Sequence, residues 1–448
     1  MSKKIAMVGG GSVSWSPTLI SDFLYTKEIE DAQYILLDID EEAGEKMARL
    51  GRATAEKRGL KASFDSTSNP KEAYIGADFV IITISTGDLD AMEYDIQIPE
   101  EYKIYQTVGD TVGPGGWARA LRNIPMFAQM AKDIEHYSPN AVVLNYTNPL
   151  SVLTNVFYKV SRLKTVGLCH GLLEVYDLLR YVSGLKDDTD IKLRFGGVNH
   201  FFWILSMAIR GEDGYSLLRK EIKQLGKGLD QLIPEAFQAK VYPHANSMVC
   251  DELFRLFGYL PYSSDRHTCE FIPGYINGGL SNIQKYKLVR TSIAERRAEK
   301  KNYRTELDQY LSGEKALPDV RSRELAASII SAMISGKEYI DVLNLPNRGQ
   351  IGNLPRGTVV ETLGVVNNLG FTPMAAGELP ENILNLILPH AHNQNLLAEA
   401  GIEGDYDKAF YALYNDPACS HLTFTEKKEM GERLLRAHKQ YLPQFSLL

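Results

Sequence analysis

A glycine-rich turn close to the N-terminus constrains the fold of this chain more than any other feature. The segment Ile5–Val8 has the apolar pattern of a buried parallel strand, and residues 17–25 have the pattern of a helix. Between them lie Gly9, Gly10 and Gly11, which allow close approach of a ligand to the backbone. The start of the helix would offer unpaired N–H groups to a pyrophosphate. This order of elements indicates a dinucleotide site, with a tight turn that binds no ligand as the alternative.

Further apolar runs alternate with helical sequence along the first third of the chain. They are short and rich in β-branched residues, as expected for strands buried on both faces. The alternation predicts an α/β fold with a Rossmann-like, doubly wound parallel sheet. Asp38 follows the second run, where an acidic residue binds the ribose hydroxyls of NAD, so NAD is the expected cofactor. The runs are 34–37, 79–84 and 141–144, with helical sequence at 41–58.

The length of the chain indicates more than one domain. A chain of 448 residues exceeds one ordinary hydrophobic core, so two domains are expected. We place a dinucleotide-binding domain at residues 1–196 and an α+β domain at residues 197–448, which closes over the nicotinamide half of the crevice. Long helices at 322–335 and 383–400 are expected in the second domain.

Charge and apolar content argue against several classes of partner. The formal net charge is −7 and the basic residues are scattered, which argues against a nucleic acid partner. The longest apolar runs, such as Phe79–Ile84, are too short to span a membrane. The N-terminus has no signal-peptide pattern, and four cysteines in so long a chain make no disulfide framework. We therefore expect a cytoplasmic protein with no membrane partner.

Four polar stretches are predicted to follow strands and to converge at the carboxyl edge of the sheet, where such folds bind ligands. Within them, Cys169 and His200 could bind one divalent metal, although their spacing matches no compact zinc pattern. Taken singly, Cys169 fits a small buried apolar residue and His200 a hydrogen-bonded core histidine. Asn145 and Asn148 could be ordinary turn residues before Pro149. The stretches are VGDTVGPGGWARALR (108–122), NYTNP (145–149), VGLCHGL (166–172) and GGVNHFFW (196–203).

Together with GGGS and SSDRHTCEF (263–271), these stretches resemble the motifs of glycoside hydrolase family 4, the NAD- and manganese-dependent glycosidases. The resemblance runs from Ile5 to at least Pro417 and includes NLPNRGQIGNLP (344–355). It implies a fold similar to that of lactate and malate dehydrogenases, with hydrolysis as the net reaction. NAD would then stay bound as a redox switch and would not be consumed.

The resemblance also implies a reaction that needs no pair of carboxylates. Hydride transfer from sugar C3 to NAD leaves a ketone, which makes the C2 proton acidic enough for a base to remove. A divalent metal, Mn²⁺ in the family, would supply Lewis acidity at the sugar oxygens O2 and O3. The C1 substituent then leaves with help from an acid, water adds, and the hydride returns to C3.

The resemblance implies the site residues position by position. Asp265 resembles the base at C2, His170 the acid at the leaving group, and Cys169 and His200 the metal ligands. By itself, Asp265 after two serines would be a turn or a helix cap, and Arg119 would belong to a solvated helix face shared with a second arginine. The implied contacts to the sugar are Asn148, Asn199, Arg119, Arg266 and His267, and those to NAD are Gly9, Gly11, Ser12 and Asp38.

The residues after Cys169 indicate a branch of the family. Phospho-α-glucosidases carry Cys-Asp-Met-Pro and phospho-β-glucosidases Cys-Asn-x-Pro, whereas this chain has Cys-His-Gly-Leu at 169–172. The loop IYQTVGDTVGPGG (104–116) and DRHTCEF (265–271) look closest to α-galacturonidases and their α-glucuronidase and α-galactosidase relatives. Gly171-Leu172 departs from the Glu-Val of those galacturonidases. A uronide therefore ranks first as substrate, a neutral α-glucoside or α-galactoside second, and a phosphosugar third.

Two other classes of function are open. An NAD-dependent dehydrogenase of a sugar or a 2-hydroxy acid would need no metal and would turn over free NAD. A sensor that binds NAD would need no catalytic groups. The family forms dimers or tetramers, so a homodimer or homotetramer acting on a small carbohydrate is expected.

Overall fold

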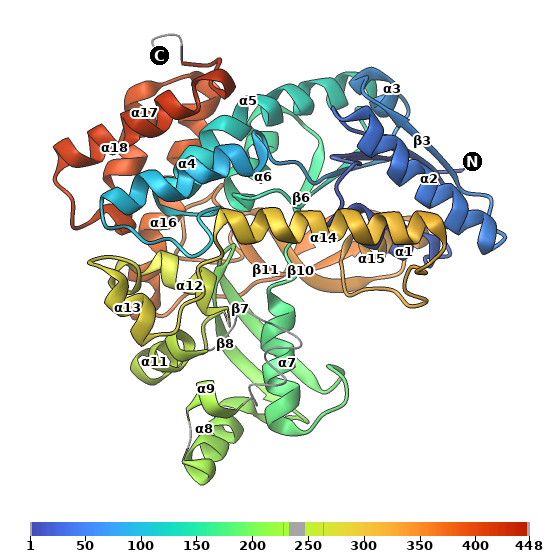
Figure 1. The fold of residues 1–448 in the computed structure, drawn as a ribbon. Coiled ribbons are helices and arrows are strands. Elements are labelled where there is room, and N and C mark those ends of the chain that lie inside the picture. Colours follow the sequence, from blue (N-terminus) through green and yellow to red (C-terminus); the bar gives the residue numbers. More distant parts are fainter. Residues whose placement is uncertain (1, 227, 233–246, 263, 446–448) are drawn as a thin grey trace.

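The structure is a computed structural model that describes residues 2–226, 228–232, 247–262 and 264–445. One twelve-stranded sheet runs through it, with helices on both faces (Figure 1). The strand order is β3-β2-β1-β4-β5-β6-β10-β11-β7-β8-β9, and β12 pairs with β11.

The first six strands form the parallel part of the sheet, in the order found in dinucleotide-binding folds. This confirms the predicted fold class, and each predicted strand overlaps an observed one. One strand was missed because only Phe64 of its five residues is buried, so it lacks the continuous apolar run of its neighbours. The strands are β1 (Lys4–Val8), β2 (Gln33–Leu37), β3 (Ser63–Thr67), β4 (Phe79–Ile82), β5 (Val142–Asn145) and β6 (Lys164–Gly167).

The second half of the chain continues the same sheet with antiparallel strands. Strand β10 pairs with β6 through Asn344 opposite Gly167, so the strands of both halves of the chain belong to one continuous sheet. The predicted domain boundary between residues 196 and 197 lies inside β7, and it stays a prediction. These strands are β7 (Ile191–Val198), β8 (Phe201–Ile209), β9 (Glu212–Asp213), β10 (Tyr339–Pro346), β11 (Val359–Asn367) and β12 (Gly370–Pro373).

Helices cover both faces because alternate residues of the parallel strands point to opposite sides. In β1, Ala6 and Val8 belong to one buried core and Ile5 and Met7 to the other. Helices α5, α6 and α16 pack into the first core and α1, α2 and α15 into the second. The helices of the first half are α1 (Ser16–Leu24), α2 (Glu41–Lys57), α3 (Pro70–Tyr74), α4 (Asp88–Glu101), α5 (Gly113–Tyr137), α6 (Leu150–Val160) and α7 (Leu172–Ser183).

The helices of the second half lie around the antiparallel strands, and α14 crosses the molecule to reach α2 and α4 (Figure 1). Both long helices predicted there overlap α15 and α16. Within the described ranges, no helix is long and apolar enough to cross a membrane. The helices are α8 (Gly214–Leu225), α9 (Leu229–Leu232), α11 (Met248–Phe257), α12 (Asp265–Phe271), η1 (Pro273–Tyr275), α13 (Leu280–Lys285), α14 (Ile293–Ser312), α15 (Ala326–Ser335), α16 (Glu381–Glu403), α17 (Tyr406–Tyr414), η2 (Pro417–Cys419), α18 (Phe424–Ala437) and η3 (Lys439–Tyr441).

One of the four polar stretches does not follow a strand. The stretch 108–122 comes after helix α4, so the prediction that all four stretches follow strands is wrong for it. The buried residues of α4 recur every three or four positions, the period of a helix, which explains why no strand forms before the loop; they are Ala91, Met92, Asp95, Ile98 and Pro99. The other three stretches do contain or follow a strand end, at β5, β6 and β7.

Candidate active site

A carboxylate and two imidazoles meet where three separate segments converge. One ligand atom each from Asp110, His200 and His267 lies within 4.8 Å of the other two. Asp110 belongs to the loop before α5, His200 to the turn between β7 and β8, and His267 to α12. His200 has a left-handed backbone (φ 65°), a conformation that a non-glycine residue keeps only where its surroundings hold it. A carboxylate with two imidazoles is a donor set that fits a divalent transition metal.

The electrostatics of this cluster favour the protonation states that a metal requires. Burial alone would raise the pKa of Asp110, but His267 and Arg119 hold it well below its usual value. Burial lowers the pKa of His200 to about 4 and lowers that of His267 as well. Near neutral pH the carboxylate is therefore anionic and both imidazoles are neutral, ready to bind a cation without losing protons. Thr111 Oγ1 lies 3.0 Å from His200 Nδ1 and orients the ring.

Glu270 holds the loop that carries Asp110. Its Oε1 accepts hydrogen bonds from Val108 N (2.6 Å), Gly109 N (2.9 Å) and Thr107 Oγ1 (3.0 Å), and the residue is 1 % exposed. Glu270 lies one helical turn after His267 on α12. A single short helix therefore presents one member of the cluster and fixes the loop that presents another.

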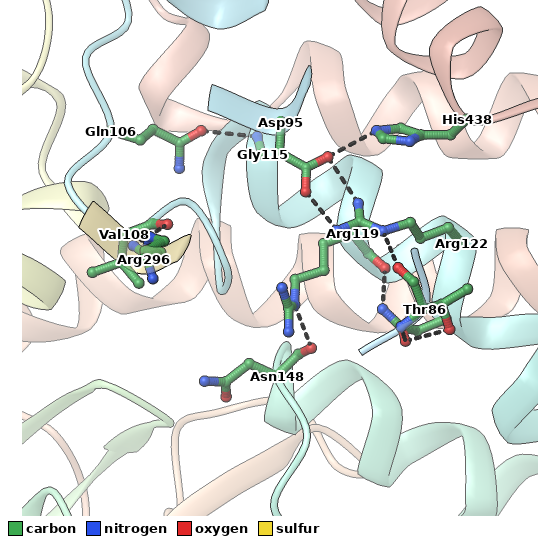
Figure 2. A network of polar contacts seen from close by, with 11 residues as sticks. Thr86, Asp95, Gln106, Val108, Gly115, Arg119, Arg122, Asn148, Arg296 and His438 are labelled. Atoms are coloured by element: carbon green, nitrogen blue, oxygen red, sulfur yellow. Dashed lines mark hydrogen bonds and ion pairs between the residues drawn. The ribbon is translucent and has the colours of Figure 1, made fainter. Parts of the chain in front are cut away.

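Arg119 and Asn148 approach the cluster from the side of the parallel sheet. Asn148 Nδ2 donates to Asp110 Oδ2 (3.2 Å), and Arg119 Nε donates to the carbonyl of Asn148 (3.0 Å; Figure 2). The alternative that Arg119 shares a solvated face with Arg122 is wrong. Arg122 is fully buried and forms an ion pair with Asp95 (2.6 Å), which also binds His438 (Figure 2). This network joins α5 to α4 and to His438 at the C-terminal end of α18.

Cys169 lies outside the Asp110–His200–His267 cluster. Its half-buried thiol accepts a long hydrogen bond from Gly171 N (3.4 Å). Burial raises the pKa of Cys169, so the free thiol is protonated, and only a nearby cation would make it a thiolate. Whether Cys169 binds a metal together with His200 therefore stays a prediction.

A second group of acids lies near Cys169. Asn199 Nδ2 donates to Glu361 Oε2 (2.8 Å), and burial raises the pKa of Glu361 to about 7. The half-exposed His170 holds Glu324 at 3.0 Å through Nδ1. Burial alone would lower the pKa of His170, but Glu324 raises it overall, which favours a protonated imidazole. A protonated ring at this position is suited to donating a proton.

Asp265 binds the backbone of a neighbouring helix. The residue is 1 % exposed, and its carboxylate accepts hydrogen bonds from Val249 N (2.7 Å) and Cys250 N (3.0 Å) in the first turn of α11. Burial raises the pKa of Asp265 to about 6 in spite of these bonds. The side chain thus caps α11 from outside that helix, and it is not the local cap of its own helix that the two preceding serines suggested. Its role as a base stays a prediction.

The glycine turn fits a dinucleotide-binding fold. Gly9 has φ 82°, and a Cβ there would lie 2.7 Å from the Thr83 carbonyl. Asp38 Oδ2 accepts a hydrogen bond from Gly11 N (2.8 Å), and Ser12 Oγ accepts one from Trp15 N (3.3 Å). Asp38 also lines an open, acidic cavity of about 580 Å³, and none of residues 9–12 lines it. It is lined by Asp38, Glu41, Glu42, Gly44, Glu45, Ser66, Thr67, Ser68, Asn69 and Glu72.

Sequence reasoning singled out His200 and His267 but missed Asp110, Glu270 and Glu361. Asp110 is the one acidic residue in the glycine- and threonine-rich stretch 107–116, and that contrast was an available signal. Glu270 and Glu361 have no comparable signal, since an acid in a helix or a strand usually faces solvent.

Comparison with known proteins identifies the family. Residues 4–185 match the model of family 4 glycosyl hydrolase, and residues 195–419 match the model of the family 4 C-terminal domain. This chain belongs to glycosyl hydrolase family 4. The predicted resemblance is thereby confirmed, and the protein is a family 4 glycosidase.

Individual relatives cover nearly the whole chain. An alpha-galacturonidase of Bacillus subtilis (strain 168) is 36% identical over 92% of this chain and 93% of its own. An alpha-galactosidase of the same organism is 30% identical over 99% of this chain and 100% of its own.

Solved structures have the same fold. The protein lplD of Bacillus subtilis superimposes with a TM-score of 0.89 at 32% identity, covering 97% of this chain and 100% of its own. A 6-phospho-alpha-glucosidase from gut microorganisms, crystallised with NAD and Mn²⁺, has a TM-score of 0.82 at 21% identity and covers 99% of both chains. At that identity the second likeness supports the fold alone.

Proposed function

We propose that this family 4 glycosidase hydrolyses α-galacturonides, with NAD and a divalent metal such as Mn²⁺ bound in the site. The observation that carries the proposal is the Asp110–His200–His267 cluster, which has the donor set and protonation states of a metal site in a fold whose glycine turn fits NAD. The similarity to an alpha-galacturonidase at 36% identity supports the uronide. When bound, NAD supplies reversible acceptance of a hydride and the metal supplies Lewis acidity.

The residues of the chain then bind and orient the sugar and move protons. His200 would hold the metal, with Cys169 as the resemblance implies or with Asp110 and His267 as the geometry favours. His170, kept protonated by Glu324, would donate its proton to the glycosidic oxygen.

Asp265 is proposed as the base that removes the C2 proton, on the resemblance. Arg119, Asn148, Asn199, Arg266 and His267 are proposed to contact the sugar, and Gly9, Gly11, Ser12 and Asp38 to hold NAD. The proposal is supported at the cluster by the contacts of Asn148 with Asp110 and of Arg119 with Asn148, and at the glycine turn by the contact of Asp38 with Gly11.

We also propose a homodimer or homotetramer in the cytoplasm. The cysteines Cys169, Cys250, Cys269 and Cys419 are all free, which fits a reducing compartment. Sedimentation of the purified protein measures the oligomeric state.

The function is tested with 4-nitrophenyl α-galacturonide and the matched α-galactoside. Release of nitrophenol from the galacturonide should require NAD, Mn²⁺ and a reductant together, and reduced nicotinamide should not accumulate. Stoichiometric accumulation of NADH would instead identify a dehydrogenase. Faster release from the galactoside would contradict the choice of a galacturonide as substrate, and it would leave the proposed NAD- and metal-dependent hydrolysis unaffected.

A further inference from the structure

Two arginines from different helices donate hydrogen bonds to the same residue, beside the Asp110–His200–His267 cluster. Arg266 of α12 donates from Nη2 to Thr291 Oγ1 (3.1 Å), and Arg296 of α14 donates from Nε to the Thr291 carbonyl (3.3 Å). Thr291 lies in the segment just before α14. Because both guanidinium groups bind this one residue, they are close neighbours. Within the described parts of the chain, neither is within ion-pair distance of a carboxylate.

Such a pair is unfavourable unless an anion joins it. Two like charges repel, and both side chains are partly buried, where water screens them less. Arg266 Nε is buried with no hydrogen-bond partner in the described structure. Burial and the charge of Arg266 lower the pKa of Arg296. Arg266 therefore has an unused buried donor, and the two neighbouring positive charges favour an anion between them.

The neighbouring arginine on α14 shows the contrast. Arg297 is exposed and pairs with Asp90 (2.8 Å) and Glu93 (2.9 Å). Acids act electrostatically on the partly buried pair, among them Asp110 and Glu270 on Arg296 and Glu174 on Arg266, but none of these three lies within ion-pair distance. Burial raises the pKa of Glu174 to about 7, so its carboxyl group is only partly charged near neutral pH. Glu270 binds the amides of the loop, and Asp110 binds Asn148 and belongs to the cluster.

The pair lies against the edge of the cluster. Arg266 directly precedes His267, a member of the cluster. Arg296 Nη2 donates to the carbonyl of Val108 (3.4 Å), two residues before Asp110 (Figure 2). A sugar bound at the cluster would therefore have one side close to these two guanidinium groups.

We propose that Arg266 and Arg296 bind the C6 carboxylate of a uronide substrate, and that Arg296 is the residue that selects a uronide over a neutral hexoside. The inference rests on the proposed function, since it names the groups that recognise the charge of that substrate. Planar guanidinium groups match a carboxylate in shape and charge and bind it through paired hydrogen bonds. A neutral hexoside has a hydroxymethyl group at C6 and leaves the two cations unneutralised.

The test compares kcat/KM for the galacturonide and the galactoside in the NAD- and Mn²⁺-loaded enzyme. Arg296→Gln should lower kcat/KM for the galacturonide by about 10- to 150-fold, the range for a lost charged hydrogen bond, and leave the galactoside within about threefold. For Arg296→Lys, kcat/KM for the galacturonide should lie between the values of the wild type and of Arg296→Gln, because lysine keeps the charge but lacks the planar guanidinium group. Arg297→Gln, one residue along the same helix, is the matched control and should change neither substrate.

Binding of the product supplies a second measurement that does not depend on turnover. By calorimetry, Arg296→Gln should weaken the binding of galacturonate and leave that of galactose unchanged. An unaltered preference for galacturonide in Arg296→Gln, or an equal loss on both substrates, would overturn the inference while the proposed function stands. A wild-type enzyme that does not hydrolyse the galacturonide would overturn the proposed function and the inference with it.

Discussion

Replacing Glu270 by glutamine should weaken both the fold and the metal site, because this carboxylate fixes the loop that carries Asp110. All three donors from the loop bind the same oxygen, Oε1, which glutamine retains. The substitution therefore removes the charge and keeps the shape. In place of Oε2, glutamine puts an amide nitrogen toward Gln106 Nε2, which lies 3.4 Å from Oε2.

The magnitude follows from these contacts. A charged acceptor makes a hydrogen bond roughly twice as strong as a neutral one, about 0.5–1 kcal/mol more for each of the three bonds. The relief of burying a charge offsets part of this loss. We expect the free energy of unfolding to fall by about 2 kcal/mol for Glu270→Gln. For Glu270→Ala we expect a fall of about 4 kcal/mol, because three buried donors lose their acceptor.

Urea unfolding measures the stability, and titration of the NAD-loaded protein with Mn²⁺ measures the metal affinity. Loss of a group that orients a ligand typically weakens metal binding by about 10- to 100-fold, and Glu270→Gln should lie in this range. Glu429→Gln on the exposed face of α18 is the control and should change neither quantity. Wild-type metal affinity in a destabilised Glu270→Gln would refute the coupling between α12 and the loop.

Three further predictions concern the cluster, the base and the cofactor. His200→Ala should lose Mn²⁺-dependent hydrolysis with the fold intact. If the sulfur is a ligand, Cys169→Ser should lower the rate of hydrolysis by at least about tenfold. Full activity of either variant would show that the replaced residue is not a metal ligand. The Asp265→Asn enzyme should bind NAD, but its rate of hydrolysis should fall by about a hundredfold. The wild-type enzyme in heavy water should place deuterium at C2 of the released sugar, and unlabelled product would count against the redox route. Asp38→Ala should weaken the binding of NAD and reduce the preference for NAD over NADP, because this carboxylate repels a 2′-phosphate. Fluorescence titration measures both affinities, and an unchanged preference would exclude Asp38 from the ribose site.

The parallel half of the fold was predictable because its strands are buried on both faces. The run Phe79–Ile82 has four buried residues in a row, as do β1, β2 and β5, and such a run indicates a strand in the sequence. Strand β3 was not predicted because only Phe64 of its five residues is buried. The position of the loop 102–112 after a helix could not be read from its glycines, since a glycine-rich loop can follow either type of element.

The candidate site was predictable only in part, because its members are brought together by tertiary contacts. His200 and His267 were identified by resemblance, but their meeting with Asp110 depends on how α12 packs on the loop. Arg296 and Arg297 are adjacent in a charged run, and only the fold shows that Arg296 is partly buried beside the cluster and Arg297 is paired with acids at the surface. The sequence also offered no sign that the Asp265 carboxylate binds the start of α11.

A sheet of twelve strands leaves unpaired backbone groups at its ends, which another molecule could extend into an aggregate. The ends of this sheet are unsuited to such growth. Strand β9 is the exposed pair Glu212–Asp213, β3 exposes Asp65, and β12 ends at Pro373. A second copy would meet like charges at β9 and β3, and a residue without an N–H at the end of β12. Copies of this chain are therefore expected to assemble through their helices, with each sheet confined to its own molecule.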